Sequence, residues 1–119
     1  MLFNKSNQQT IMQKVRFANT LWQRFKGLMF LPKKRFDFAL IFDFGSETQE
    51  RASIHMLFVF FFISVVYLDA QKKVVDIKQN LRPGTLFYMP KKKARYLIEL
   101  PPEKAKEIKL NDTLDWKTV

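Results

Sequence analysis

The sequence predicts a mainly β (α+β) fold, in which a small closed or barrel-like antiparallel sheet is accompanied by two short helices. Two observations lead to this prediction. Many short stretches alternate apolar and polar residues with a period of two, and turn-forming residues separate these stretches at regular intervals. A closed sheet would also hide its strand edges. The length of 119 residues suits a single domain over 1–119, in which the polar residues 1–10 are expected to be a flexible or edge segment.

The first half of the chain is predicted to hold strands and one helix. A short strand over 13–17 alternates apolar and basic residues. A helix follows over 20–26 and ends at Gly27, since a left-handed residue commonly closes a helix. The clearest strand covers 36–44, where every second residue is aromatic or aliphatic, and another is expected over 52–60.

The second half is predicted to be mostly strand. Four strands are expected over 63–69, 73–79, 85–89 and 94–100. The first two form a hairpin around Ala70-Gln71-Lys72. Pro101-Pro102 can open the second short helix, and a terminal strand contains Leu114 and Trp116.

Composition limits the classes of function. Basic residues outnumber acidic ones by 21 to 11, which gives a formal net charge of +10 spread over both halves of the chain. Such a charge favours anionic partners but does not determine the fold. The absence of cysteine excludes disulfides, thiolate metal sites and cysteine nucleophiles.

No targeting or membrane-spanning segment is predicted. The start of the chain lacks the basic and then apolar order of a secretory signal. The longest apolar stretch, 54–68, is shorter than the roughly 18 residues that a membrane-spanning helix needs. We therefore expect a soluble, cytoplasmic protein with no membrane insertion.

Three segments of the chain stand in an order that resembles a known family. They are Ala18-x-Thr20 with Arg24-x-x-Gly27-Leu28-Met29, the apolar block from Ser53 to Asp69 with Val74-Val75, and Ala94-Arg95-Tyr96-Leu97-Ile98-Glu99-Leu100 before Asn111-Asp112. Together they resemble the family called domain of unknown function 192, in its archaeal form. The resemblance implies a compact, β-rich, barrel-like fold with short helices, and it implies no established activity.

The central block departs from the pattern of this family. Many relatives carry Trp-Met-Lys-Asn-Thr and then Ile-Pro-Leu-Asp. This chain reads Ile54-His55-Met56-Leu57-Phe58 and then Phe61-Phe62-Ile63-Ser64. A site that relatives build from these Lys, Asn and Asp residues would therefore be largely apolar here.

Arg24, His55 and Glu99 are the candidate ligand-binding residues. His55 is the only histidine and could act as an acid or base near neutral pH, although a lone histidine is more often a structural hydrogen-bonding group. Arg24 and Glu99 lie in the family-like motifs and could pair or bind a polar ligand together. The alternative is that Arg24 covers helix surface and Glu99 points outward to water. We predict no catalytic residue, no metal site and no cofactor, since the sequence holds no phosphate loop, nucleophile elbow or metal-binding histidine pair.

Two basic runs are the candidate nucleic-acid surface. They consist of Lys33, Lys34 and Arg35, and of Lys91, Lys92 and Lys93 with Arg95. Cations that neutralise phosphates beside aromatic faces that stack bases are typical of such surfaces, and Phe87, Tyr88 and Tyr96 are near the second run in sequence. The alternative is that both runs are solvated edges that prevent strand-to-strand aggregation.

Three hypotheses for function remain at this stage. The leading one is a small non-enzymatic binding module that holds a protein or a small ligand. Nucleic-acid binding through the basic surface is the alternative. An enzyme of unknown type is the third, and it would need Arg24, His55 and Glu99 to meet in one pocket. The pattern leaves open whether residues 58–62 are core or a partner surface.

Overall fold

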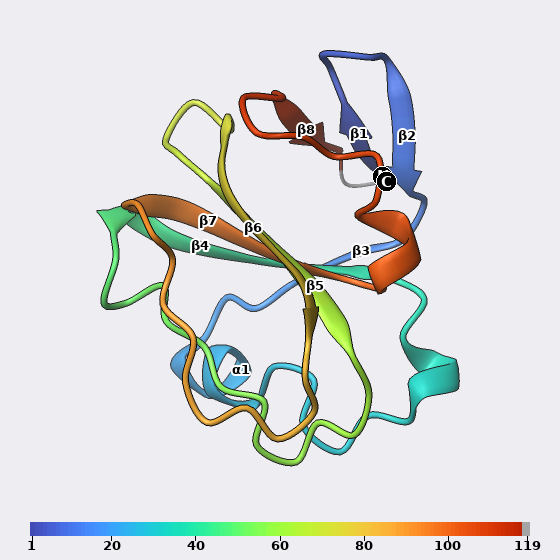
Figure 1. The fold of residues 1–119 in the computed structure, drawn as a ribbon, viewed down its shortest axis with the longest axis vertical. Coiled ribbons are helices and arrows are strands. Elements are labelled where there is room, and N and C mark those ends of the chain that lie inside the picture. The colour runs from blue at the N-terminus through green and yellow to red at the C-terminus, as the bar shows by residue number, and fades with distance from the viewer. Residues whose placement is uncertain (118–119) are drawn as a thin grey trace.

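The computed structural model describes residues 1–117, which form two β-sheets and one short helix (Figure 1). The larger sheet has the strand order β3-β4-β7-β5-β6, and the smaller one has the order β2-β1-β8. The strands are β1 Leu2–Asn4, β2 Gln9–Met12, β3 Val15–Phe17, β4 Ala39–Thr48, β5 Ile63–Leu68, β6 Val74–Leu81, β7 Ala94–Leu100 and β8 Leu114–Trp116. The helix α1 is Leu21–Lys26, and two 3₁₀ turns cover Lys33–Arg35 and Pro102–Lys104.

The larger sheet is open, so the prediction of a closed or barrel-like sheet is wrong. Among the described strands, β3 and β6 are its two edges. The sheet is also not wholly antiparallel, because β3 runs parallel to β4. A parallel pair needs a long crossover connection, and α1 lies in that connection. Alternation along one strand shows which side chains are buried but does not show how the sheet edges pair, which explains the error.

The predicted helices are confirmed in part. The helix over 20–26 is observed as α1, and Thr20 caps it because its Oγ1 accepts a hydrogen bond from the Gln23 N–H at 3.0 Å. The second helix is wrong, since the chain after Pro101 makes only the 3₁₀ turn Pro102–Lys104. There the backbone bonds close over three residues instead of four, as from the Ala105 N–H to the Pro102 carbonyl at 3.2 Å.

The strands predicted over 52–60 and 85–89 are wrong as strands. They reduce to one isolated antiparallel bridge between Ile54 and Tyr88. Between the two strands that flank it, the 52–60 segment is instead a loop that sends Met56 and Val59 into the core. Alternation here reflects a loop folded over the sheet, because a loop with one buried side produces the same pattern as a half-buried strand.

Residues 1–10, expected to be flexible or at an edge, form β1 and begin β2, which is an edge strand of the smaller sheet. The strand β1 is the central strand of the smaller sheet, and Leu2 is fully buried. The hairpin predicted around Ala70-Gln71-Lys72 is confirmed as β5 and β6.

The larger sheet is buried on both faces. Figure 1 shows β1, β2 and β8 on one side of it, and α1 with the loops 49–62 and 82–93 on the other. On β4, Leu40 and Phe42 belong to the core on the α1 side, while Ile41 belongs to the core on the opposite side. On β7, Leu97 faces the α1 side and Ile98 the other. Glu99 follows Ile98, so the alternation of the strand turns its carboxyl toward the α1 side.

Candidate functional site

A cavity of about 320 Å³ lies between α1, the 51–59 loop and the α1 side of the larger sheet. This volume falls within the range of small-ligand sites, roughly 300 to 1,000 Å³. Its lining consists of Arg24, Phe25, Lys26, Gly27, Leu28, Phe42, Phe44, Arg51, Ser53, Ile54, His55, Met56, Val59 and Glu99. The structure thus brings the three sequence-predicted binding residues, Arg24, His55 and Glu99, to the wall of one cavity.

Glu99 is the most unusual residue of this wall. It lies on β7 between β4 and β5, opposite Leu40 and Val65, and only 4% of its surface is exposed. Its Oε1 atom has no hydrogen-bond partner. Burial raises the pKa of Glu99 to about 8, so the carboxyl is predominantly protonated at neutral pH. The outward-pointing alternative for Glu99 is therefore wrong, because loops cover the face of the sheet that this side chain joins.

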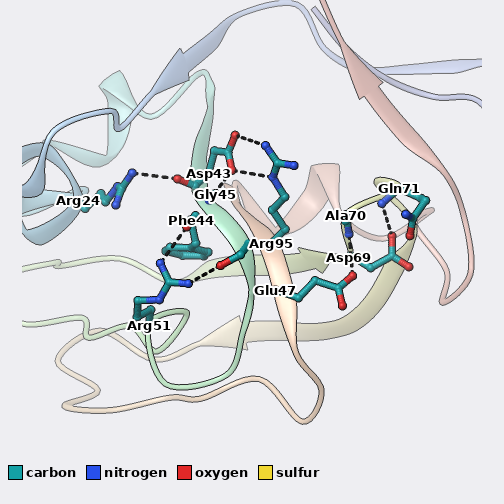
Figure 2. Close-up of polar contacts among 11 residues, drawn as sticks. Arg24, Asp43, Phe44, Gly45, Glu47, Arg51, Asp69, Ala70, Gln71 and Arg95 are labelled. Atoms are coloured by element: carbon teal, nitrogen blue, oxygen red, sulfur yellow. Dashed lines mark hydrogen bonds and ion pairs between the residues drawn. The ribbon is translucent and has the colours of Figure 1, made fainter.

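Arg24 reaches the cavity from α1. Its Nη2 donates to the main-chain carbonyl of Asp43 at 2.9 Å, which ties the helix to β4 (Figure 2). Its Nε is buried and has no hydrogen-bond partner. Arg24 makes no ion pair with Glu99 within the described part of the chain, so each of these residues keeps one buried polar atom unmatched in the same wall.

His55 joins the 51–59 loop to α1. Its Nδ1 accepts a hydrogen bond from the Leu57 N–H at 3.2 Å, and its Nε2 lies 3.2 Å from the Phe25 carbonyl. A main-chain N–H can only donate, so we assign the proton to Nε2, which donates to Phe25. The Phe25 ring also lies 5.3 Å from the His55 ring. Both nitrogens are thus engaged, which agrees with the structural alternative for this histidine.

Two further arginines organise the strand beside the cavity. Figure 2 shows Arg24 and Arg95 approaching Asp43 from opposite sides. Arg95 holds the Asp43 carboxylate with two bonds of 3.0 and 3.2 Å. Although partial burial acts in the other direction, these bonds and the Gly45 N–H lower the pKa of Asp43. Arg51 donates from Nη1 to the Phe44 carbonyl at 2.9 Å and lines the cavity.

The two basic runs do not adjoin. The turn Lys33–Arg35 and the start of β7, which Lys91, Lys92 and Lys93 precede, lie on opposite sides of the ribbon in Figure 1. The six side chains of these runs are exposed. Arg95 is engaged with Asp43 and with the face of Tyr96, at 5.0 Å from the ring centre. The runs therefore do not form one continuous phosphate-binding surface with Arg95 in it.

The apolar wall and Arg51 were not among the sequence-predicted site residues. Phe42 and Phe44 stand in the clearest alternating strand of the sequence, where they read as ordinary core residues. Arg51 stands in a polar loop and carries no local signal at all. These residues line a cavity only because α1 and the 51–59 loop do not fill the space above β4.

The comparisons with known proteins agree with the sequence motifs. The model of the family DUF192, described as "Uncharacterized ACR", matches residues 2–116. The chain belongs to the DUF192 family. Relatives include a UPF0127 protein of the archaeon Thermococcus sibiricus, 40% identical over 119 residues, covering 98% of this chain and 75% of the relative. A UPF0127 protein of Pyrococcus horikoshii is 38% identical over 120 residues, covering 99% of this chain and 100% of the relative.

Solved structures share the DUF192 fold at low identity. One is a protein from Sinorhizobium meliloti that is provisionally described as a transcription regulator. It has a TM-score of 0.76 and 21% sequence identity to this chain, and the match covers 85% of this chain and 79% of that protein. A protein of unknown function from Novosphingobium aromaticivorans has a TM-score of 0.76 and 20% identity, covering 86% of this chain and 74% of its own. These likenesses show the fold of this chain and nothing of its ligand.

No helix within residues 1–117 has the length and apolar character needed to cross a bilayer.

Proposed function

We propose that this DUF192 protein is a non-enzymatic binding module for a small carboxylic acid with an aromatic or branched aliphatic body. The ligand occupies the cavity between α1 and β4. The observation that carries the proposal is the pair of unmatched buried polar atoms, Arg24 Nε and Glu99 Oε1, in the wall of one apolar cavity.

The two unmatched groups set the polar end of the ligand. The Arg24 Nε–H can only donate a hydrogen bond. Glu99 is predominantly protonated at neutral pH because burial raises its pKa to about 8, so its carboxyl can also donate. Both groups therefore favour an acceptor, such as a carboxylate or carbonyl oxygen. Leaving buried donors unmatched costs about 1–3 kcal/mol each, and a ligand acceptor removes this cost.

The remaining wall sets the body and charge of the ligand. Phe25, Phe42 and Phe44 provide aromatic faces, and Leu28, Met56 and Val59 provide aliphatic surface. The basic side chains Arg24, Lys26 and Arg51 line the same cavity, and Glu99 is the one acid among its lining residues. An anionic head group on an apolar body matches this arrangement, whereas a cationic head group does not.

The test uses small probes in a matched series on ¹⁵N-labelled protein. Phenylacetate and 4-methylpentanoate carry the proposed carboxylate, phenylacetamide is neutral, and phenethylamine is a cation with the same ring. We expect the two acids to shift the amide resonances of Gly27, Ile54 and His55 in a saturable manner and the amine to leave them unchanged. Equal binding of the amine, or no saturable shift with either acid, would contradict the proposal.

Two variants assign the binding to the polar atoms. Arg24→Met should weaken phenylacetate binding by about tenfold or more, the value of a charge-assisted hydrogen bond. Lys78→Met is the matched control, since Lys78 is exposed on β6 and does not line the cavity. In the wild type, binding should also weaken above about pH 8 as Glu99 ionises and repels the carboxylate, and Glu99→Gln should remove this dependence.

An enzyme is the second candidate, and one observation favours it. Glu99 has a pKa of about 8, within reach of neutral pH, as suits a general acid or base. The same NMR samples test this candidate when the resonances of each bound probe are followed overnight. Conversion of a probe by the wild type that is lost in Glu99→Gln, with binding retained, would establish the enzyme and reject the pure binding module.

A further inference from the structure

One end of the molecule exposes a cluster of large apolar side chains. Of the exposed large apolar side chains that the structure describes, all but Leu110 come from three segments, 18–36, 52–62 and 82–90. They are Trp22, Phe25, Phe30, Leu57, Phe58, Phe60, Phe62, Leu86, Phe87 and Met89. Leu86 is 75% exposed and Phe60 is 70% exposed. We call this set of three segments the aromatic end.

The three segments of the aromatic end lie side by side, because hydrogen bonds tie them together. The Phe30 N–H donates to the Phe58 carbonyl at 2.9 Å, and the two rings stack at 4.9 Å. The Met56 N–H donates to the Thr85 carbonyl at 2.6 Å, which joins the second segment to the third. Figure 1 shows the three segments gathered at its lower end, with β1, β2 and β8 at the upper end.

Exposed and buried side chains alternate along part of the aromatic end. In the stretch 58–62, Val59 and Phe61 are buried, whereas Phe58, Phe60 and Phe62 are exposed. Phe30 and Phe58 also adopt positive φ angles of 63° and 58°, a backbone conformation that bulky residues rarely adopt. Folding alone would favour Gly or Asn at such positions and polar residues at exposed ones, so these side chains point to an interaction.

The charge of the aromatic end is of one sign. Its three segments contain no Asp or Glu, and they contain the basic residues Arg24, Lys26, Lys33, Lys34, Arg35 and Arg82. Of these, all except Arg24 are exposed. Exposed apolar groups and cations on the same three segments match a surface that offers an apolar layer beneath an anionic one.

We propose that the aromatic end docks this protein on the surface of a membrane that contains anionic lipids. The phenyl, indole and leucyl side chains enter the interfacial layer, and the basic residues bind lipid phosphates. In this proposal only side chains enter the layer, and no segment of the chain crosses the membrane. The proposal does not depend on the ligand proposed for the cavity.

The same observations disfavour other occupants of this surface. A second copy of the chain would bring two cationic ends together with no carboxylate in either to pair with them. Single-stranded nucleic acid needs aromatic faces along a groove that tracks the phosphate backbone. Here aliphatic Leu57, Leu86 and Met89 share the exposed surface, and such side chains gain from an acyl layer but do not stack bases.

The test is flotation of the whole chain with vesicles. One set is phosphatidylcholine alone, and the other is an equimolar mixture of phosphatidylcholine and phosphatidylglycerol. We expect binding to the anionic vesicles that decreases as salt is raised, little binding to the neutral ones, and a blue shift of Trp22 emission that Trp22→Phe removes. Absence of binding to anionic vesicles overturns the proposal.

Two pairs of variants assign the binding to this end. The triple variant Phe60→Ser, Leu86→Ser and Phe87→Ser should lower the vesicle partition coefficient by about tenfold or more, while Leu110→Ser, at an exposed leucine elsewhere, should not. Lys33→Ala, Lys34→Ala and Arg35→Ala together should lower it by a similar factor at low salt. Lys91→Ala, Lys92→Ala and Lys93→Ala together remove the same number of charges and should lower the partition coefficient far less.

The outcomes that overturn the proposal are distinct. Equal loss in the two charge-matched triple variants would mean that binding depends on net charge alone. Self-association that the Phe60, Leu86 and Phe87 variant abolishes, without vesicle binding, would assign the surface to a second copy. Binding of labelled single-stranded RNA or DNA through these same residues, without vesicle binding, would assign it to nucleic acid. Because the altered side chains are exposed, circular dichroism should show that each variant remains folded.

Discussion

Gly27 lies directly against the Glu99 carboxyl: a Cβ atom at position 27 would stand 3.7 Å from Glu99 Oε1. The backbone of Gly27 has φ +47°, which ends α1 and turns the chain across the cavity. A distance of 3.7 Å is an ordinary contact, so a side chain at this position is limited by the backbone angle and not by a clash. Glycine therefore allows the helix to end next to a buried acid.

Gly27→Ala should lower the free energy of unfolding by about 1–2 kcal/mol, because alanine is strained at positive φ. Urea unfolding monitored by circular dichroism measures this change. Gly84→Ala is the control, since Gly84 also has positive φ but a Cβ there would meet nothing within 4 Å. Because the loss comes from the backbone angle, both variants should be less stable than the wild type. Unchanged stability in Gly27→Ala would contradict this explanation.

The buried Glu99 should make the stability of the protein depend on pH. The pKa of Glu99 is about 8 in the folded state against 4.5 for an ordinary glutamate, so between these values the folded state holds the extra proton. Stability should therefore fall as pH rises from about 5 to about 8, by about 3 kcal/mol from this group.

Urea unfolding at several pH values, in the wild type and in Glu99→Gln, isolates this contribution. As pH rises from about 5 to about 8, the wild type should lose more unfolding free energy than Glu99→Gln does. Parallel pH profiles would show that Glu99 is ionised, or hydrogen-bonded to solvent, in the folded protein.

Leu2→Ala should destabilise the protein by about 2–4 kcal/mol, as expected for truncation of a buried leucine. Leu2 is fully buried in the core on the β1 side of the larger sheet, where Leu114 is also fully buried. Leu110→Ala, at a leucine with 58% exposure, should change stability by less than about 0.5 kcal/mol. Similar midpoints for the two variants in urea unfolding would mean that β1 contributes little to the stable fold.

His55→Ala should cost about 1–2 kcal/mol through the two hydrogen bonds that it removes, from the Leu57 N–H and to the Phe25 carbonyl. It should weaken binding of phenylacetate only indirectly, by loosening the 51–59 loop. His55→Asn keeps a short polar side chain and should recover part of the stability. A loss of binding in His55→Asn at unchanged stability would instead assign His55 a direct contact with the ligand.

Much of the local structure could be predicted from the sequence. The capped helix over 20–26, the β5–β6 hairpin and the strands β3, β4 and β7 all follow from period, caps and turn residues. These features depend on near neighbours in the chain, which is why a single sequence contains them. The family-like motifs also contain Arg24 and Glu99, two predicted binding residues that line the cavity.

The alternating pattern did not distinguish a strand from a loop that covers a sheet. Met56 and Val59 are as buried as strand residues, yet among the described residues of their segment only Ile54 forms a β-bridge, with Tyr88. An alternating pattern shows only that one side of a segment is buried. A loop that packs over a sheet also has one buried side, so it produces the same pattern.

The sequence by itself determined the positions of the turns, the helix and most strands, the charge of +10 and the family. Tertiary structure decided that the larger sheet stays open and is covered on both faces, and this covering buries Glu99. It also decided that Arg24, from a helix, and Glu99, from a strand far along the chain, meet at one cavity. Burial of a polar group depends on residues distant in sequence that exclude water from it, and no local pattern contains that information.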